Sequence, residues 1–489
     1  MALTGDWDRR ISRRTLLKTG GSFTAAMVLT GLTGLRAFAQ QSDDPFTLGV
    51  ASGDPTPKGV VLWTRLAPDP LAVGGGLTAE PFEVRWELAY DDDFRHVFRQ
   101  GTTVALPEEA HSVRVELDEL PPEREYFYRF KAGDHVSPHG RTHTTPPGNS
   151  MVAGVTFAFV SCQHFADGHF TPYADVAADR AIETVIFLGD YIYEGGARGV
   201  RAHSPAKEIR TLDEYRIRHG QYKTDLHLQA AHAAHPWLVT WDDHEFKNNY
   251  ANLDLDPDVP IDQVRARRAA AYRAYWEHMP LACTATTRDG SGYCPDDINP
   301  ERTMLGAEQR AWLLEELATT KTRWNVLAQQ TGFGPFNRAT DGISRTFGTG
   351  ADSWDGYVAE RQAILDWMVE QGTPNPMVLT GDTHQNWIRN VPPDYRSFEG
   401  APVATEILGT SVSTNGTPTA PVTRRGDDPN NPHIPFRDNH RGYVRCAVTP
   451  ELWTSEFRVV DTVAQPEATT STLATFVTEN GRPGAQPAW

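Results

Sequence analysis

The sequence predicts an α/β protein that begins with a β-rich domain, and three observations support this prediction. Residues 45–145 contain short stretches in which apolar and polar residues alternate, separated by Gly, Pro and Asp, as in strands joined by turns. After residue 150, apolar strand-like runs alternate with segments of helical periodicity, which is the order of elements in an α/β domain. The 489 residues are enough for two or three domains of about 100–200 residues each.

The N-terminal strands favour a β-sandwich. They are expected at residues 60–65, 82–88, 112–117 and 126–130. Leu120-Pro121-Pro122 followed by Tyr126 resembles the tyrosine corner of immunoglobulin-like and fibronectin-like sandwiches. The Thr-Pro-Pro-Gly sequence at residues 145–148 suits a linker. We therefore expect a sandwich domain at residues 40–148.

The next part of the chain is expected to form an α/β domain at residues 149–460. Its predicted helices cover residues 261–279, 307–320 and 357–371, where apolar residues recur at helical spacing. The first of these helices has a basic face, which we interpret as its solvent-exposed side. Residues 461–489 are rich in Thr, Pro and Gly and form a C-terminal tail that either folds back or stays loose.

The charge and the cysteine count exclude some classes of protein. Asp and Glu number 63 against 46 Lys and Arg, a formal net charge of −17. An acidic chain repels phosphate backbones, which argues against a nucleic-acid-binding protein, but a bound metal ion can reverse the local field for a small anion. Four cysteines are too few for a disulfide-built scaffold. Cys283 and Cys294 can form a disulfide in an oxidising compartment, which would leave Cys446 as a buried thiol.

The first 39 residues resemble an export signal. Ser12 to Lys18 resembles the twin-arginine motif, residues 21–35 form a mildly apolar run, and Ala37-Phe38-Ala39 suits a cleavage site. A membrane anchor is the alternative, but this run is shorter than the ~20 residues needed to cross a bilayer. We therefore expect export by the twin-arginine machinery, which gives a periplasmic or secreted monomer without a stable membrane anchor.

Four apolar runs after residue 150 end in side chains that bind metal ions. The runs are residues 155–160, 184–188, 237–240 and 377–380. In an open α/β sheet, binding sites form beyond the carboxyl ends of the strands. The candidate ligands that follow these runs are Cys162, Asp190, Tyr193, Asp243, Asn249, Asp382 and His384. Each alone has a structural explanation, such as a buried thiol or a helix cap, but together they predict a metal site.

The ligand types suggest two different cations. Two cations about 3.5–4 Å apart can hold the attacking and leaving oxygens of a phosphoryl transfer, and Asp190 is the natural bridging carboxylate. The phenol of Tyr193 together with a thiol suits a highly charged ion such as ferric iron, although softness alone would allow zinc. Carboxylate and amide oxygens suit calcium or magnesium, and Asn248 is an alternative to Asn249 as the amide ligand.

Six segments of the chain are similar to those of a known family. They are Phe46 to Pro55, Ser161-Cys162-Gln163, Gly189 to Tyr193, Trp241 to Glu245 with Asn248-Asn249, Trp354 to Tyr357, and Gly381 to His384. Together they resemble the PhoD-like alkaline phosphatases, a family of calcineurin-like metallophosphoesterases related to the purple acid phosphatases. The resemblance extends over residues 45–450, and the combination is far more specific than the Gly-Asp-x-x-Tyr element alone.

The resemblance implies a fold and a set of ligands. The fold is an immunoglobulin/fibronectin-like β-sandwich followed by a four-layer α/β/β/α metallophosphoesterase domain. The metals are Fe³⁺ and one or two Ca²⁺ ions. Iron would be held by Cys162, Asp190, Tyr193 and His384. Calcium would be held by the shared Asp190 with Asp243, Asn249 and Asp382.

Two elements depart from the wider superfamily. Ser161-Cys162-Gln163 stands where the superfamily has Asp-x-His, which is the pattern of the PhoD-like branch. Gly381-Asp382-Thr383-His384 stands where it has Gly-His-x-His, so an oxygen ligand replaces a nitrogen ligand. That replacement favours calcium over zinc in the second position.

The predicted function is that of an exported phosphatase. Its substrates are small phosphate monoesters, and phosphodiesters as well, and a metal-bound hydroxide attacks phosphorus. His244 stabilises the transition state or protonates the leaving oxygen, or it only orients its neighbours.

Three other functions are the alternatives. A dedicated phosphodiesterase or phospholipase-type enzyme would use the same ligands. A non-catalytic exported metal-containing binding protein is disfavoured because the carboxylate-rich ligand set leaves room for water. An exported iron redox enzyme is disfavoured because the sequence has no dinucleotide-binding glycine motif and no cysteine cluster.

Overall fold

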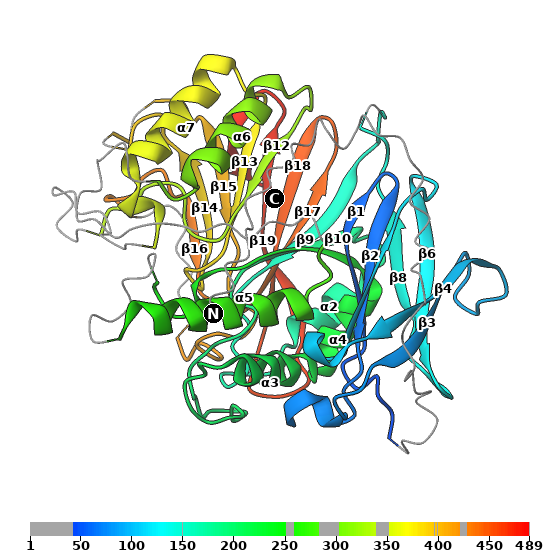
Figure 1. Ribbon diagram of the computed structural model, residues 1–489. Coiled ribbons are helices and arrows are strands. Elements are labelled where there is room, and N and C mark those ends of the chain that lie inside the picture. Colours follow the sequence, from blue (N-terminus) through cyan, green and yellow to red (C-terminus); the bar gives the residue numbers. More distant parts are fainter. Residues whose placement is uncertain are drawn as a thin grey trace, which may run out of the picture. The chain divides into compact units, whose positions relative to one another are not determined.

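Ten strands, drawn from both ends of the chain, form one large mixed sheet in the computed structural model (Figure 1). The structure describes residues 43–148, 150–250, 259–282, 303–338, 352–395, 397–398, 400–420 and 428–488. All of them belong to one compact unit, residues 36–489. The predicted export signal and the predicted Cys283–Cys294 pair lie outside the described residues.

The middle of the large sheet is parallel. In spatial order the strands are β20 (Arg482–Pro487), β19 (Thr470–Glu479), β18 (Leu452–Val460), β17 (Gly442–Val448), β9 (Val155–Val160), β10 (Thr184–Leu188), β11 (Pro236–Thr240), β1 (Val50–Thr56), β2 (Gly59–Arg65) and β5 (Ser112–Leu117). The four strands β9, β10, β11 and β1 pair in parallel. Because parallel neighbours end at the same edge, the residues that follow β9, β10 and β11 come together there.

A second sheet of five strands packs against the large one. Its spatial order is β12 (Asn325–Ala328), β13 (Pro376–Thr380), β15 (Ala404–Leu408), β14 (Asn386–Val391) and β16 (Phe436–Asp438). Apolar side chains from both sheets form one buried cluster, which includes Phe159, Leu379 and Phe457. A bridge between Ser161, after β9, and Ser411, after β15, joins the ends of strands from the two sheets.

Helices lie against the other side of each sheet (Figure 1). Helices α2 (Pro172–Ala178), α3 (Leu212–Lys223), α4 (Leu226–Ala234) and α5 (Ile261–His278) share a buried cluster with the large sheet. Helices α6 (Gly306–Thr319) and α7 (Val358–Gln371) share another with the second sheet. The short 3-10 helices are η1 (Val73–Gly76), η2 (Pro107–Glu109), η3 (Asp243–Glu245) and η4 (Trp354–Gly356). Within the described ranges, no helix has both the length and the apolar character that crossing a bilayer requires.

Helical periodicity finds only some of these helices. The three helices predicted from it are confirmed as α5, α6 and α7. Helix α3 does not show the pattern, because it buries Arg218, His219 and Lys223 beside its aromatic residues. Its start is defined by a capping box, in which Thr211 and Glu214 each accept the backbone N–H of the other, at 3.4 Å and 3.0 Å.

The N-terminal strands build a third sheet. Strands β4 (Val97–Ala105), β3 (Phe82–Ala89), β6 (Arg124–Ala132) and β7 (His135–Val136) are neighbours in that order, and β8 (Gly140–Thr144) pairs with β6. This sheet faces β1, β2 and β5 across a buried cluster that includes Leu62, Val84 and Tyr128. The Tyr126 hydroxyl donates to the carbonyl of Pro121 at 3.2 Å, as in a tyrosine corner.

The large sheet continues across the boundary that the sequence predicts between the first two domains. Strand β1 pairs in parallel with β11, through Ser52 with Pro236 and Gly53 with Trp237. Gly53 permits this close approach, because a Cβ there would lie 2.8 Å from the carbonyl oxygen of Trp237 in β11. The strands β1, β2 and β5 therefore belong both to the N-terminal pair of sheets and to the central sheet.

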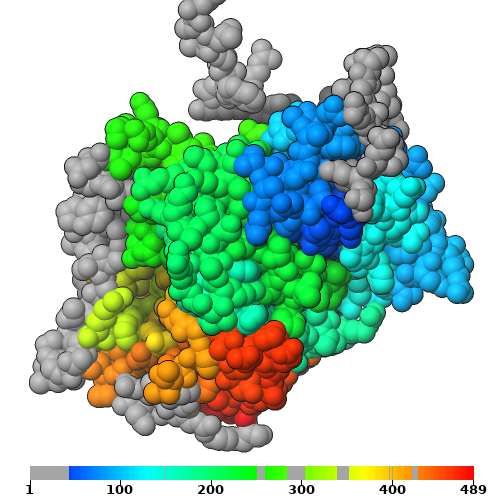
Figure 2. Space-filling view, turned by 90° about the horizontal axis from the view of Figure 1, so that it is seen from below, coloured from blue at the N-terminus to red at the C-terminus, as the bar shows by residue number. Residues whose placement is uncertain are grey.

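The C-terminal residues fold back, which is one of the two alternatives that the sequence left open. They form β19 and β20 at one edge of the large sheet. The N–H groups of Gly484 and Ala485 donate to side chains of the second sheet, those of Thr405 at 2.8 Å and Asn390 at 3.0 Å. Figure 2 shows the C-terminal residues, in red, at the surface beside green and orange segments. Strand β20 thus connects the large sheet to the second sheet.

Candidate metal centre

Four strand ends bring predicted ligands together. Cys162 follows β9, Asp190 follows β10, Asp243 lies in η3 after β11, and His384 follows β13. Donor atoms of Cys162, Asp190 and His384 lie within 4.8 Å of one another, and so do those of Asp190, Asp243 and His244. Asp190 belongs to both groups, as expected for a bridging carboxylate.

The centre has two halves, which we name by their ligands. The thiol half consists of Cys162, Asp190, Tyr193 and His384. The carboxylate half consists of Asp190, Asp243, Asn249 and Asp382. The structure links the predicted ligands of the two halves in different ways.

Tyr193 joins the thiol half through its hydroxyl. The hydroxyl donates to Asp190 Oδ2 at 2.8 Å and lies 3.4 Å from His384 Nε2. A third neighbour, Thr414 Oγ1, lies 2.8 Å away. The phenol oxygen is therefore directed at the groups with which it would share an ion.

Asp382 and Asn249 complete the carboxylate half less directly. Asp382 Oδ2 accepts a hydrogen bond from the Thr331 hydroxyl at 2.8 Å. Besides burial, the negative charge of Asp243 raises the pKa of Asp382, which indicates that the two carboxylates are close. Asn249 is exposed and is held through its backbone, whose N–H donates to Asp243 Oδ2. The backbone N–H of Asn248 instead donates to Glu194 at 2.9 Å.

The carboxylates of this site repel one another. Burial, and then the charge of Asp190, raise the pKa of Asp243 to about 7. Burial, and then the charge of Asp243, raise the pKa of Asp382 to about 6. Burial also raises the pKa of Asp190 itself. Buried acids at this spacing are costly to ionise unless a cation compensates them.

The donor atoms fit such a cation. Asp190 Oδ1 is buried and has no hydrogen-bond partner among the described residues, although buried carboxylate oxygens are normally satisfied. Cys162 is a free, fully buried thiol, whose pKa is raised well above its usual value by burial and by Asp190. A bound metal ion would satisfy the orphaned oxygen and stabilise the thiolate. Cys446 is likewise a buried free thiol, as predicted.

The backbone of the site is strained at the predicted ligands. Cys162, Asp190, Asn249, Asp382 and His384 all have positive φ angles, between 54° and 61°. Residues other than glycine rarely adopt this region, at a cost of about 1–3 kcal/mol each, and such residues cluster at functional sites. The surrounding structure must therefore hold these five residues in place.

Glu245 holds the loop after β10, a role that the sequence does not predict. Its carboxylate accepts the N–H groups of Asp190 at 3.0 Å and Ile192 at 3.4 Å, and also that of Tyr191. It accepts the N–H of Asp242 at 2.6 Å as well. One buried carboxylate thus positions Asp190, the predicted bridging residue, relative to η3.

His244 is held between Tyr193 and Glu194. Its Nδ1 lies 2.7 Å from Glu194 Oε2, and the two ring centroids of His244 and Tyr193 lie 4.0 Å apart. Burial opposes protonation, but the carboxylates of Asp190 and Glu194 outweigh it and raise the pKa of His244 to about 10. The sequence does not predict Glu194, because its partner is 50 residues away.

Two residues after β15 also support the thiol half without having been predicted. Thr414 Oγ1 donates to the Cys162 carbonyl at 2.6 Å, in addition to its contact with Tyr193. Asn415 Nδ2 lies 3.0 Å from His384 Nδ1. They follow β15, whose sequence includes Thr405 and Glu406, so a search for apolar runs alone does not find this strand end.

The fold and the gathered donor groups fit the class of metal-dependent hydrolases, and comparison with known proteins identifies the family. The model of the PhoD-like phosphatase family matches residues 157–294 and 286–457, and the model of its N-terminal domain matches residues 33–146. The chain therefore belongs to the PhoD-like phosphatase family, as the sequence motifs predict, and is a hydrolase of phosphoric esters.

Individual relatives agree with this assignment. Alkaline phosphatase D of Bacillus subtilis (strain 168) is 42% identical over 494 aligned residues, which cover 91% of this chain and 82% of that protein. A solved structure described as "Structure of PhoD" is 41% identical and superposes with a TM-score of 0.86, covering 92% of this chain and 93% of that one. The mixed α/β fold is therefore that of PhoD.

Proposed function

We propose that this protein is an exported phosphatase that hydrolyses phosphate monoesters, with phosphodiesterase activity in addition, and that it depends on a mixed iron and calcium centre. The position of Asp190 in both ligand groups carries this proposal. A carboxylate shared by two cation sites is what a pair of ions acting on one phosphate requires. When bound, the ions would lower the pKa of a water molecule and neutralise charge on the phosphate.

The thiol half is proposed to hold Fe³⁺ through Cys162, Asp190, Tyr193 and His384. Burial raises the pKa of both the Cys162 thiol and the Tyr193 phenol well above their usual values. A thiolate and a phenolate on one ion are stabilised best by a highly charged cation, which favours ferric iron. The carboxylate half offers oxygen atoms alone and is proposed to hold one or two Ca²⁺ ions.

The visible spectrum tests the iron assignment. A tyrosinate bound to ferric iron absorbs visible light, so Tyr193→Phe should remove the colour of the metal-loaded chain. Tyr443→Phe is the matched control, because that buried tyrosine bonds to Asp175 at 2.7 Å and belongs to neither half. A Tyr193→Phe chain that keeps its colour would refute the phenolate ligand.

His244 is proposed to protonate the leaving oxygen or to stabilise the transition state. Glu194 occupies Nδ1 of the ring, so Nε2 is the nitrogen that remains to donate a hydrogen bond. The carboxylates of Asp190 and Glu194 favour the protonated ring, which is the form that a general acid needs. If the ring only orients its neighbours, His244→Ala should lower metal content as much as turnover.

We further propose the organisation that the sequence predicts. Residues 1–39 would direct twin-arginine export to the periplasm or outside the cell, where the chain is a monomer without a stable membrane anchor. Residues 40–148 would form the immunoglobulin/fibronectin-like sandwich, residues 149–460 the four-layer α/β/β/α catalytic domain, and residues 461–489 the tail. The first boundary is supported by the two family models, which end at residue 146 and begin at residue 157.

Hydrolysis of two chromogenic substrates tests the function. The mature chain is assayed with 4-nitrophenyl phosphate and bis(4-nitrophenyl) phosphate, before and after removal of metals and after addition of iron, calcium or both. We expect monoester hydrolysis that disappears on stripping and returns only with both ions. Hydrolysis of the diester alone would favour the dedicated phosphodiesterase. No hydrolysis by the fully metal-loaded chain would favour a binding protein.

A further inference from the structure

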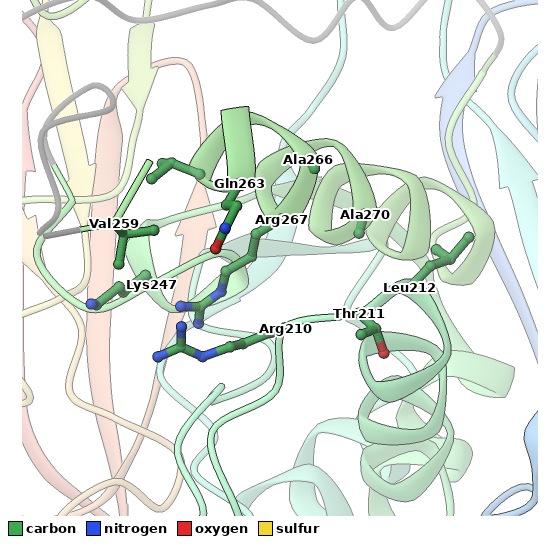
Figure 3. A pocket seen from close by; sticks show the side chains of 10 residues that line it. Arg210, Thr211, Leu212, Lys247, Val259, Gln263, Ala266, Arg267 and Ala270 are labelled. Carbon is green, nitrogen blue, oxygen red and sulfur yellow. The ribbon is translucent and has the colours of Figure 1, made fainter. Parts of the chain in front are cut away.

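A cavity of about 380 Å³ lies beside the turn that carries two residues of the carboxylate half, Asp243 and Asn249 (Figure 3). The start of α3 and the first turns of α5 form its walls, together with Lys247. The backbone N–H of Lys247 donates to the carbonyl of Asp243 at 2.7 Å. The cavity and the proposed calcium ligands Asp243 and Asn249 therefore share one short segment of chain.

Three of the residues that line this cavity are cations, and the others are uncharged. Arg210, Lys247 and Arg267 contribute three cations, and both arginines share the carboxylate of Glu208, at 3.1 Å and 2.7 Å. Figure 3 shows the charged ends of Arg210 and Arg267 close together below Gln263. In a chain with a net charge of −17, such a local excess of positive charge selects anions against the overall field.

One of the three cations, Arg267, is fixed in position. Arg267 is buried, and it donates through Nε to the Tyr215 hydroxyl at 3.0 Å and through Nη2 to the Phe246 carbonyl at 3.3 Å. Tyr215 donates to the same carbonyl at 2.7 Å. Phe246 lies in the turn between η3 and Asn249, so the arginine is attached to the segment that supplies the calcium ligands.

We propose that this cavity binds a second phosphate group of the substrate while another phosphate is hydrolysed at the metal centre. The proposal rests on the proposed function. Guanidinium and ammonium groups bind phosphate oxygens through short, charge-assisted hydrogen bonds. The cavity also has the size of a small-ligand site, within the range of about 300–1,000 Å³. The preferred substrates are therefore small molecules with two phosphates separated by a short linker.

A matched pair of substrates tests the subsite. Release of inorganic phosphate from butane-1,4-diol bisphosphate is compared with release from butyl phosphate, using the full metal-loaded chain. We expect kcat/KM for the bisphosphate to be about tenfold higher, well above the factor of two expected from its two phosphates, because charge-assisted contacts to a second phosphate are strong. Added salt should reduce this ratio, because it screens the cations.

Variants locate the effect. Lys247→Gln or Arg210→Gln should reduce the bisphosphate-to-monophosphate ratio of kcat/KM by about three- to tenfold. Arg265→Gln removes the same charge from the exposed face of α5 outside the cavity and should leave the ratio as it is in the unmodified chain. A ratio near two in the unmodified chain, or a ratio that Lys247→Gln leaves unchanged, would overturn the proposal.

A binding measurement separates failure of the subsite from failure of the phosphatase. Inorganic phosphate is titrated calorimetrically into the metal-free chain, whose crowded carboxylates repel anions at the metal centre. We expect one weak site that Lys247→Gln removes and Arg265→Gln retains. Absence of that site would overturn the subsite whatever the enzyme hydrolyses. Its presence in a chain that hydrolyses no phosphate ester when metal-loaded would overturn the proposed function alone.

Discussion

The thiol half and the carboxylate half of the metal centre are built in different ways. The donor side chains of the thiol half are connected inside the protein, where Tyr193 contacts Asp190, His384 and Thr414. The carboxylate half includes an exposed residue, Asn249, which is attached through its backbone to Asp243. We infer that the thiol half retains its ion firmly, whereas the carboxylate half exchanges its ion with solvent.

Replacing the residue that both halves share should have the largest effect. Asp190→Asn removes the bridging charge, and we expect activity to fall by more than about 10²-fold, since even residues behind a metal ligand change activity by about 10–100-fold. Iron and calcium contents, measured by elemental analysis, should both fall. Loss of only one metal would show that Asp190 belongs to one half and does not bridge.

Replacing His244 should separate an effect on turnover from an effect on metal binding. His244→Ala is expected to lower turnover by about 10²–10⁴-fold, the usual contribution of a general acid or base, while both metals remain bound. Glu194→Gln replaces the carboxylate that contacts Nδ1 of His244 with a neutral amide. A smaller loss of turnover, about 10–100-fold, is therefore expected. Equal losses of turnover and metal content in His244→Ala would mean that the ring only supports the ligands.

A mutation confined to the exposed ligand should affect only the carboxylate half. Asn249→Ala should weaken calcium binding by about 10–100-fold and leave the iron absorption band in place. Excess calcium should then restore activity, which is followed by titrating the ion into the stripped variant. Asn248→Ala is the matched control, because the Asn248 backbone bonds to Glu194. If the calcium dependence changed in Asn248→Ala and not in Asn249→Ala, Asn248 would be the calcium ligand instead of Asn249.

The crowded carboxylates should also give the metal-free chain a characteristic pH dependence. The folded pKa values of Asp382 and Asp243, about 6 and about 7, lie above the ordinary value of 3.8. The folded chain therefore binds more protons than the unfolded chain between these values, and stability that is present below about pH 4 is lost as the pH rises to about 7. We expect the unfolding free energy to fall by about 2–5 kcal/mol over this interval.

Urea unfolding at pH 5 and pH 8 measures this effect. The double variant Asp243→Asn with Asp382→Asn should lose a measurable part of the pH dependence, and the remainder belongs to other buried groups such as Glu245, whose pKa burial raises to about 8. Added calcium should remove the dependence in the unmodified chain. A metal-free chain that is equally stable at both pH values would show that these two carboxylates do not repel their neighbours.

Most of the proposed ligands could be singled out from the sequence because they follow an apolar run closely. Asp190 comes two residues after β10 and Cys162 two residues after β9, so a one-dimensional rule finds them. Glu194 and Glu245 act through contacts between residues far apart in the sequence. Glu194 contacts His244, 50 positions away, and Glu245 accepts the N–H of Asp190, 55 positions away. No local pattern marks such a pair, and the sequence therefore supplies ligands without the residues that position them.

The fold was predictable to a similar extent. Periodicity identified α5, α6 and α7, in which more than half of the buried residues are apolar, although α5 also buries Arg267 and α7 Arg361. It missed α3, where most of the buried residues are polar or charged. Alternation identified N-terminal strands, but it does not show that β1 pairs with β11. That pairing depends on close approach at Gly53, a property of the assembled structure.

The order of strands in the large sheet affects how the chain is made. Strand β9 pairs with β17, and β18, β19 and β20 follow outward from it, so one side of the central sheet comes from residues 442–487, far along the chain from β9. Domains generally fold as they leave the ribosome, N-terminal part first. This chain cannot finish its central sheet in that way, because β9 lacks its neighbour β17 until residues 442–448 have been synthesised. A premature stop after β16 would remove that whole side of the sheet and yield no folded fragment.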